Sequence, residues 1–181
     1  RDLRTGRRIE PALLSRLPVE PYDVLDFGEL RTLAARVNVN EVPLILLGSH
    51  WTSRVTADSE SKRIAYAEAL YRAYLTEYRF DAAVDLIICG DFNTEPGSVP
   101  VVDHLRAVGD RTRLLPGDPQ PYLLDLMAGL DPDRDGTYLY RGRWEIPDFI
   151  TVSPGLLDDR GWSVRADSLR VRNAYPLRGG R

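Results

Sequence analysis

The chain has 181 residues, of which 43% are hydrophobic and 28% charged, so it is long enough for one domain with a substantial core. Its formal net charge of -3 argues against a protein that holds nucleic acid tightly through charge alone. The single cysteine, Cys89, excludes an internal disulfide and a cysteine-based zinc site.

The sequence carries no apolar stretch near the ~20 residues needed to cross a membrane, and no signal peptide is visible. It begins at Arg1 without a methionine, so a signal further upstream is compatible with the sequence. The sequence thus leaves the location open and favours the cytoplasm only slightly.

The N-terminal quarter is the hardest part to interpret. Four prolines interrupt residues 1–43, and only residues 24–37 have helical spacing. The apolar run 44–47 then predicts a strand buried on both faces. Apolar residues recur on a helical period over 59–78, without Gly or Pro, which predicts a long amphipathic helix. Residues 84–89 predict a second buried strand, parallel to the first if the crossover through the helix is right-handed.

The second half of the chain predicts shorter elements. Ser98 is placed to cap a short helix that runs to Leu105. A proline-bearing connection, 110–121, is followed by an apolar segment. Residues 137–140 and 149–152 have the composition of strands, and they are expected to form a hairpin. The order strand, helix, strand and then hairpin predicts a mixed α/β or α+β architecture.

The segment Gly90-Asp91-Phe92-Asn93 directly follows the second buried strand. Side chains at i and i+2 of an extended segment point the same way, so Asp91 and Asn93 are predicted to face one point while Phe92 faces the core. A carboxylate and an amide at the end of a strand can hold a water or a hydrated Mg²⁺ against a phosphoryl oxygen. An Asx turn that only satisfies loop backbone explains the same spacing equally well.

A second polar cluster, from Ser49 to Arg54, follows the first buried strand. His50 can donate a hydrogen bond to a phosphate oxygen there, and Arg54 can support nearby charge. A single histidine is more often structural. The stronger signal is that both strands end in polar clusters and are joined by one helix, which brings their C-terminal ends side by side.

Six segments together resemble the endonuclease/exonuclease/phosphatase superfamily in order and spacing. They are His50-Trp51-Thr52-Ser53-Arg54, Lys62-Arg63, Gly90-Asp91-Phe92-Asn93, Gly136-Thr137-Tyr138, Arg143-Trp144 and Asp148-Phe149-Ile150-Thr151-Val152-Ser153. The resemblance is greatest to a bacterial branch with an HWPSR-like segment, where Pro usually stands in place of Thr52. It covers about 44–157 and implies an α/β (α+β) sandwich of two packed mixed β-sheets flanked by helices, here incomplete.

The resemblance also implies a reaction, namely divalent-metal-dependent hydrolysis of a phosphoester by in-line attack of an activated water, with Mg²⁺ or Mn²⁺. Asp91 would be the general base or the metal-side carboxylate, and Asn93 would orient the water and the scissile phosphate. Both residues would be metal ligands. His50 would stabilise the transition state, and Asp148 would orient a second histidine.

Arg54 and Trp144 are the candidate substrate-binding residues. Arg141 and Arg143 lie just before Trp144, and they can either contact a phosphate or form an exposed strand edge. The resemblance does not decide whether the substrate is a nucleic acid, a phospholipid head group or a nucleotide. The acidic balance of the chain mildly disfavours a high-affinity duplex nuclease. No obligate protein partner is evident.

Two departures from the family pattern stand out. The metal-binding Asn and Glu of the family lie on N-terminal strands, which are not expected before residue 44 here. Its catalytic histidine lies in an S-D-H segment beyond the last motif, whereas this chain has only His50 and His104, the latter within a predicted helix. The expectation is one domain, 1–181, truncated at both ends and with little or no activity by itself. The alternative is a catalytically inactive binding or scaffolding domain.

The segment from Asp131 to Gly136 imitates the start of an EF-hand loop. The position that should supply the bidentate glutamate is Gly142, so the strongest ligand is missing, and flanking helices are not evident. A polar turn is the preferred interpretation. A calcium-binding structural module is the remaining alternative.

Overall fold

The computed structural model of the protein describes residues 10–22, 27–165 and 168–172. Its strands are β1 (Val19–Pro21), β2 (Thr32–Val39), β3 (Val42–Ser49), β4 (Leu86–Asp91), β5 (Ala107–Val108), β6 (Leu123–Asp125), β7 (Tyr138–Tyr140), β8 (Arg143–Glu145) and β9 (Asp148–Val152). Its helices are α1 (Ser59–Phe80), the π-helix η1 (Pro100–His104), the short η2 (Arg111–Arg113), α2 (Pro132–Asp135) and η3 (Pro154–Leu157).

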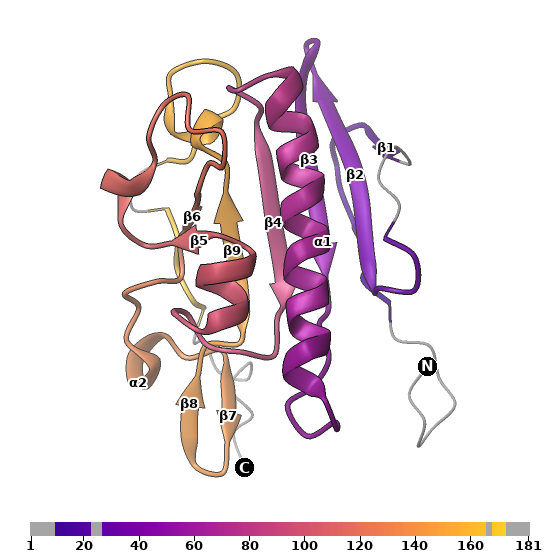
Figure 1. Ribbon diagram of the computed structural model, residues 1–181. Coiled ribbons are helices and arrows are strands. Elements are labelled where there is room, and N and C mark those ends of the chain that lie inside the picture. The colour runs from indigo at the N-terminus through magenta and orange to yellow at the C-terminus, as the bar shows by residue number, and fades with distance from the viewer. Residues whose placement is uncertain (1–9, 23–26, 166–167, 173–181) are drawn as a thin grey trace.

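Seven strands form one mixed sheet in the order β1-β2-β3-β4-β9-β6-β5, and β7 pairs with β8 in a separate two-stranded hairpin (Figure 1). β3 is parallel to β4, and β5 is parallel to β6. The other neighbours in the sheet are antiparallel. A mixed sheet, a small second sheet and a few helices agree with part of the expected α/β sandwich.

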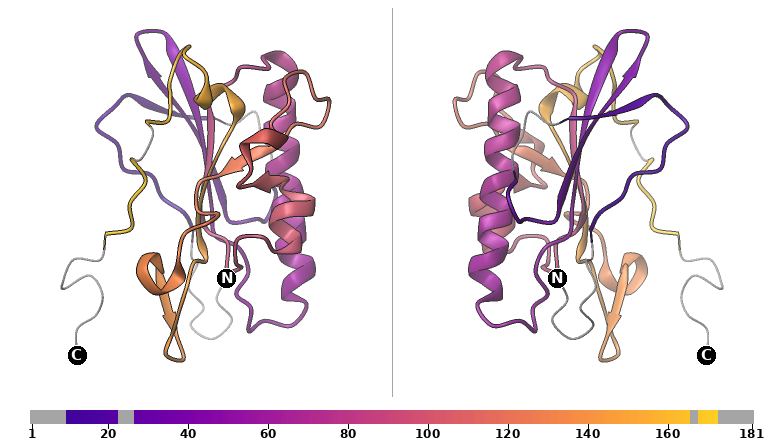
Figure 2. Two further views of the ribbon diagram at one scale, coloured as in Figure 1. Left: turned by 90° about the vertical axis from the view of Figure 1, so that its left-hand side faces the viewer. Right: turned by 90° about the vertical axis from the view of Figure 1, so that its right-hand side faces the viewer.

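The long helix predicted for 59–78 is confirmed as α1, which extends to Phe80. It lies along one face of the sheet (Figure 2) and buries Tyr66, Leu70 and Tyr74 against it. The connection through α1 makes β3 and β4 parallel, as predicted from the two apolar runs. No helix in the described part of the chain is long and apolar enough to span a bilayer.

The helix expected for 24–37 is wrong, because residues 32–37 belong to β2. The first residues of that prediction, 24–26, lie outside the described part of the chain. Ala35 and Val37, two residues apart, are each only 3% exposed. Burial of every second side chain is the pattern of a strand. Asn40 and Glu41 have φ values of 52° and 65°, as in the type I′ turn that joins two antiparallel strands. β1 and β2 therefore precede residue 44, where no strand was expected.

Each face of the sheet carries its own apolar cluster. The α1-side core includes Ile45, Leu47, Leu86 and Ile88. The cluster on the other face, here called the opposite-face cluster, contains Val37, Leu44, Leu124, Val152 and Leu156, with partly buried residues packed against them. Both faces of β3 and β4 are thus apolar, which explains why their sequences are continuous hydrophobic runs rather than alternating ones.

The hairpin expected between 137–140 and 149–152 is wrong, although both segments are strands. Arg141 and Gly142 have φ values of 49° and 81°, so they form a tight two-residue turn that pairs β7 with β8 instead. Pro147 follows β8 and lacks the N–H that would continue its ladder. β9 then enters the main sheet between β4 and β6.

Candidate active site

Three neighbouring strands carry the same short pattern at one end of the sheet, a polar residue followed by a buried aromatic residue. The pairs are His50-Trp51 after β3, Asp91-Phe92 at the end of β4, and Asp148-Phe149 at the start of β9. The three aromatic side chains belong to the α1-side core and are at most 1% exposed. Because side chains alternate across a strand, the three polar residues emerge on the face that α1 does not cover.

The three aromatic rings form a continuous stack that fixes the strand ends relative to one another. Trp51 and Phe92 have ring centroids 4.2 Å apart at an interplanar angle of 3°. Phe92 and Phe149 are 4.7 Å apart at 10°. The backbone ladder also continues here, since the Trp51 N–H donates to the Asp91 carbonyl at 2.9 Å. Such ring pairs contribute about 0.5–1.5 kcal/mol each beyond their buried area.

Gly90 allows β3 and β4 to approach closely beside the polar residues. Its φ is +137°, and a Cβ at this position would lie 2.0 Å from the Ser49 carbonyl oxygen. Only glycine fits such a contact without moving one of the strands. His50 follows Ser49 and Asp91 follows Gly90, so this close contact of the backbones also brings His50 and Asp91 together.

His50 faces Asp91 across the two strand ends. Its Nε2 lies 3.7 Å from Asp91 Oδ2, and the two side chains are 29% and 40% exposed. On the other side of the ring, Nδ1 lies 3.4 Å from Arg31 Nη1, and the same guanidinium donates to the Trp51 carbonyl at 2.7 Å. A guanidinium can only donate, so Nδ1 is the acceptor and the neutral ring carries its proton on Nε2, toward Asp91.

The surroundings of His50 favour this neutral form. Burial lowers the pKa of His50, and the positive charge of Arg31 lowers it further, while the charges of Asp91 and Asp148 act in the opposite direction. Burial raises the pKa of Asp148, the Thr137 hydroxyl lowers it, and the Asp91 charge raises it again. Asp148 and Asp91 are register partners in β9 and β4. The imidazole that Asp148 influences in this structure is that of His50.

Asp91 and Asn93 do form an Asx turn, because the Asn93 N–H donates to Asp91 Oδ1 at 2.8 Å. The extended geometry expected for this pair is wrong, since Asn93 has φ 51°, a left-handed conformation that Asn tolerates. The Asn93 amide instead donates to the Trp51 carbonyl at 3.2 Å. The turn leaves Asp91 Oδ2 directed at His50 and places the Asn93 side chain beside the same strand end.

The oxygen donors suit a hydrated divalent cation. Mg²⁺ keeps several waters and commonly takes only one or two protein oxygens besides substrate phosphate. Within the described residues, no group of three or more His, Cys, Asp or Glu side chains could hold a metal ion. Asp91 and Asn93 are the residues here that could supply oxygen ligands to a hydrated Mg²⁺ or Mn²⁺.

Arg54 is engaged in ion pairs that join the segment after β3 to the β7–β8 hairpin. It pairs with Glu145 of β8, and its Nη1 lies 3.9 Å from Glu95 Oε1. Glu95 also accepts the Ile146 N–H at 3.1 Å, and burial raises the pKa of this carboxyl. The structure thus gives Arg54 a role in positioning the hairpin, in addition to the substrate contact predicted from sequence.

Trp144 lies in β8, where its register partner is Leu139. Its side chain packs close to Gly136, because a Cβ on that glycine would lie 2.6 Å from Trp144 Cβ. Neighbouring residues of a strand face opposite sides, so Trp144 points away from the side that carries Glu145. The structure therefore places Trp144 next to α2, and it does not group this residue with His50 and Asp91.

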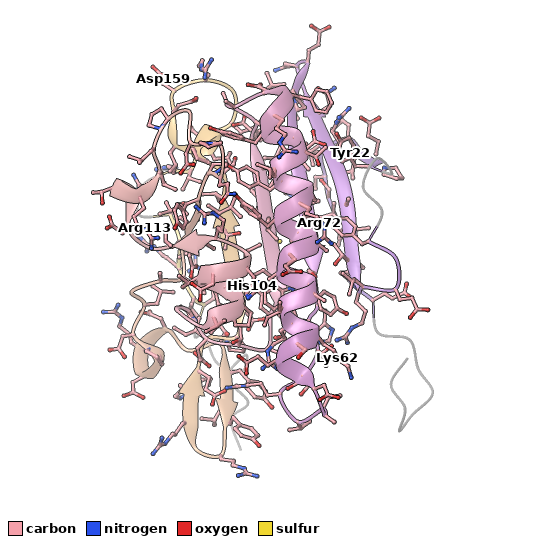
Figure 3. All side chains as sticks on the ribbon, in the orientation of Figure 1. Tyr22, Lys62, Arg72, His104, Arg113 and Asp159 are labelled. Atoms are coloured by element: carbon pink, nitrogen blue, oxygen red, sulfur yellow. The ribbon has the colours of Figure 1, made fainter. Side chains whose placement is uncertain are left out.

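His104 lies on η1 beside α1 (Figure 3), where its Nδ1 is 3.1 Å from Glu68 Oε1. Because α1 covers the face opposite to the three polar residues, His104 lies apart from them. Sequence reasoning missed Arg31, which precedes β2. No motif marks this residue, and its contact with His50 arises only from the pairing of β2 with β3.

The acidic segment from Asp131 is a helix cap. Asp131 Oδ1 accepts the Asp133 N–H at 3.0 Å and begins the four-residue helix α2. Arg134 and Asp135 form an ion pair within α2. These contacts explain the sequence pattern as a capped turn, the interpretation preferred over an EF-hand loop.

A model of the "Endonuclease/Exonuclease/phosphatase family" matches residues 30–175. The chain belongs to the endonuclease/exonuclease/phosphatase family. The match includes His50, Asp91, Asn93 and Asp148, and it extends beyond the motif resemblance of 44–157 on both sides. No curated protein sequence matches the chain.

Several solved structures match the chain. Truncated Caenorhabditis elegans TDP2 is 16% identical, with 76% of this chain and 53% of that chain covered and a TM-score of 0.53. Sphingomyelinase C from Streptomyces griseocarneus is 15% identical, with 74% and 46% covered and a TM-score of 0.46. The human Nocturnin catalytic domain with bound sulfate is 17% identical, with 76% and 47% covered and a TM-score of 0.45. The chain thus spans about half the length of these proteins, and the likeness to TDP2 shows a shared fold.

Proposed function

We propose that this member of the endonuclease/exonuclease/phosphatase family hydrolyses a phosphoester with Mg²⁺ or Mn²⁺. The observation that supports the proposal is the 3.7 Å approach of His50 Nε2 to Asp91 Oδ2 at the C-terminal ends of two parallel strands. Ligand sites of open α/β sheets commonly form at such ends. Asn93, fixed to the Trp51 carbonyl, adds an amide to the same place.

Each polar group has a role that follows from its surroundings. Asp91 is half-exposed and accepts the proton of the attacking water as general base. His50 is held neutral with a proton on Nε2, so it donates a hydrogen bond to a non-bridging phosphate oxygen without needing acid pH. Asn93 orients the water and the scissile phosphate. A divalent cation on Asp91 and Asn93 would neutralise charge on the phosphate.

Asp148 acts through its charge rather than by contact with the reacting atoms. It is paired in register with Asp91 and raises the pKa of His50 against the effects of burial and Arg31. The substrate is proposed to be nucleic acid, a phospholipid head group or a nucleotide. All three carry a phosphoester that in-line attack can cleave.

Hydrolysis of bis(p-nitrophenyl) phosphate tests the proposal, because this substrate reports phosphodiester cleavage without needing any further recognition. We expect turnover with Mg²⁺ or Mn²⁺, abolished by EDTA, in a protein that joins these residues to the family's N-terminal metal ligands and its S-D-H histidine. Asp91→Asn should lower kcat by roughly 10²- to 10⁴-fold, the usual contribution of a general base. Asp103→Asn, which removes an exposed carboxylate from η1, is the matched control and should keep the wild-type rate.

Two results would overturn the proposal. A near-normal rate in Asp91→Asn, with circular dichroism showing the folded protein, rejects the role of this carboxylate. Absence of turnover with either metal, in a protein that still binds phosphoester ligands, supports the alternative of an inactive binding domain.

A further inference from the structure

The β7–β8 hairpin exposes an unusual run of apolar side chains. It projects beyond the sheet at the end where β4 stops and β9 begins (Figure 1). Tyr138, Leu139 and Tyr140 are 50%, 51% and 37% exposed. Contiguous exposed apolar residues on a soluble surface commonly mark an interaction site, and this run is joined to the candidate active site through β9.

One face of the hairpin, here called the tyrosine face, is turned toward that site. Tyr138 is the register partner of Glu145, and Tyr140 is the partner of Arg143. Residues directly opposite each other in an antiparallel pair share a face, so these four side chains lie on the same side of the hairpin. Glu145 is held by Arg54, which belongs to the segment that follows β3. The tyrosine face is therefore linked by the Arg54–Glu145 ion pair to the segment that carries His50.

The tyrosine face combines flat aromatic rings with positive charge. The Tyr138 and Tyr140 rings are nearly parallel, with centroids 6.2 Å apart and an interplanar angle of 18°. The Arg141 guanidinium lies 5.2 Å from the centre of the Tyr140 ring. The tight turn at Arg141 and Gly142 fixes the two strands. Parallel rings beside guanidinium groups are the arrangement on which unpaired nucleic-acid bases stack.

Given the phosphoester hydrolysis proposed above, on which this step rests, we infer that the tyrosine face stacks bases of a single-stranded nucleic acid whose scissile phosphate lies at His50 and Asp91. Stacking requires bases that are not already paired in a duplex. A net charge of -3 leaves little general attraction for phosphates, so stacking supplies most of the affinity. Arg141 and Arg143 neutralise phosphate groups of the bound nucleic acid.

The composition of the hairpin tip favours nucleic acid over a lipid surface. A hairpin that enters a bilayer needs apolar residues at its tip, whereas the two-residue turn here is Arg141-Gly142, and Arg143 follows it opposite Tyr140. Placing arginine within the apolar layer costs about 2–4 kcal/mol per residue. The aromatic residues are tyrosines, whose hydroxyls stay in water while their rings offer stacking surface.

Fluorescence anisotropy with labelled oligothymidine and oligouridine, in EDTA to prevent cleavage, tests the inference and separates DNA from RNA. Tyr138→Ala and Tyr140→Ala should each weaken binding by roughly 5- to 150-fold, since stacking on one base contributes about 1–3 kcal/mol. Tyr140→Phe keeps the ring and should bind nearly as the wild type does. Phe80→Ala removes an aromatic residue that is 86% exposed at the end of α1 and should leave affinity unchanged.

The same assay with a matched duplex and with phosphatidylcholine–sphingomyelin vesicles supplies the opposing outcomes. The inference is overturned if the two alanine variants bind oligonucleotides as the wild type does, if the wild type binds neither oligonucleotide, or if only vesicles bind in a tyrosine-dependent way. Because binding is measured without metal, its failure is distinct from a failure of turnover on bis(p-nitrophenyl) phosphate.

Discussion

Substitution of Gly90 by alanine tests whether the close approach of β3 and β4 holds the site together. A Cβ at this position meets the Ser49 carbonyl oxygen at 2.0 Å and the Ser49 nitrogen at 3.1 Å, and φ is +137°. The backbone conformation alone costs about 1–3 kcal/mol for a residue with a side chain. Forcing an extra methyl into a packed contact adds about 1–3 kcal/mol. We therefore expect Gly90→Ala to lose roughly 2–6 kcal/mol of unfolding free energy.

Gly97→Ala is the matched control, because Gly97 has φ +82° but a Cβ there would meet nothing within 4 Å. It should lose only the backbone part, about 1–2 kcal/mol. Urea unfolding followed by tryptophan fluorescence measures both variants, and Trp51, next to the strained contact, contributes to the signal. Equal losses in the two variants would refute the argument that contact between the strands, rather than backbone conformation, requires glycine at position 90.

Three further predictions concern ionisation and capping. An NMR titration should place the pKa of His50 below 6.5, and Asp148→Asn should lower it further, because a charge that raises this pKa is lost; an upward shift would contradict this assignment. Burial raises the pKa of Asp125 to about 6, so the folded state holds an extra proton between about pH 4 and 6. The wild type should therefore gain stability as pH falls through this window, by up to about 3 kcal/mol. Asp125→Asn should lose that gain. The prediction fails if the urea midpoints of the two proteins change with pH in the same way between about pH 7.5 and 4.5. Asp131→Ala should cost about 1 kcal/mol through loss of the α2 cap, and calorimetry should detect no calcium binding in either protein.

The parts of the fold that follow from the sequence are those set by strong hydrophobic patterns. The continuous apolar runs that became β3 and β4, with the long amphipathic helix between them, are enough to predict a parallel pair. That pairing in turn places the residues after both strands side by side. The proximity of His50 and Asp91 therefore follows from the sequence pattern.

The features that sequence did not reveal depend on register and turn conformation. Arg31 reaches His50 only because β2 pairs with β3, and β2 itself was hidden by a chance helical spacing. Asn93 adopts a left-handed conformation, so it meets the Trp51 carbonyl instead of following the alternation of an extended strand. β7 and β8 have three residues each, too few for a reliable pattern, and the turn at Arg141 decides their pairing.

A double-mutant cycle of His50→Gln and Asp91→Asn tests the central claim most directly, namely that these two side chains act on one phosphoryl group. The assay is metal-dependent hydrolysis of bis(p-nitrophenyl) phosphate, with thermal unfolding to confirm that each variant is folded. If both side chains serve the same transition state, the double variant should be little slower than Asp91→Asn alone, because groups that act as a unit are strongly non-additive. Losses that simply multiply, or a His50→Gln variant with the wild-type rate, would contradict the account.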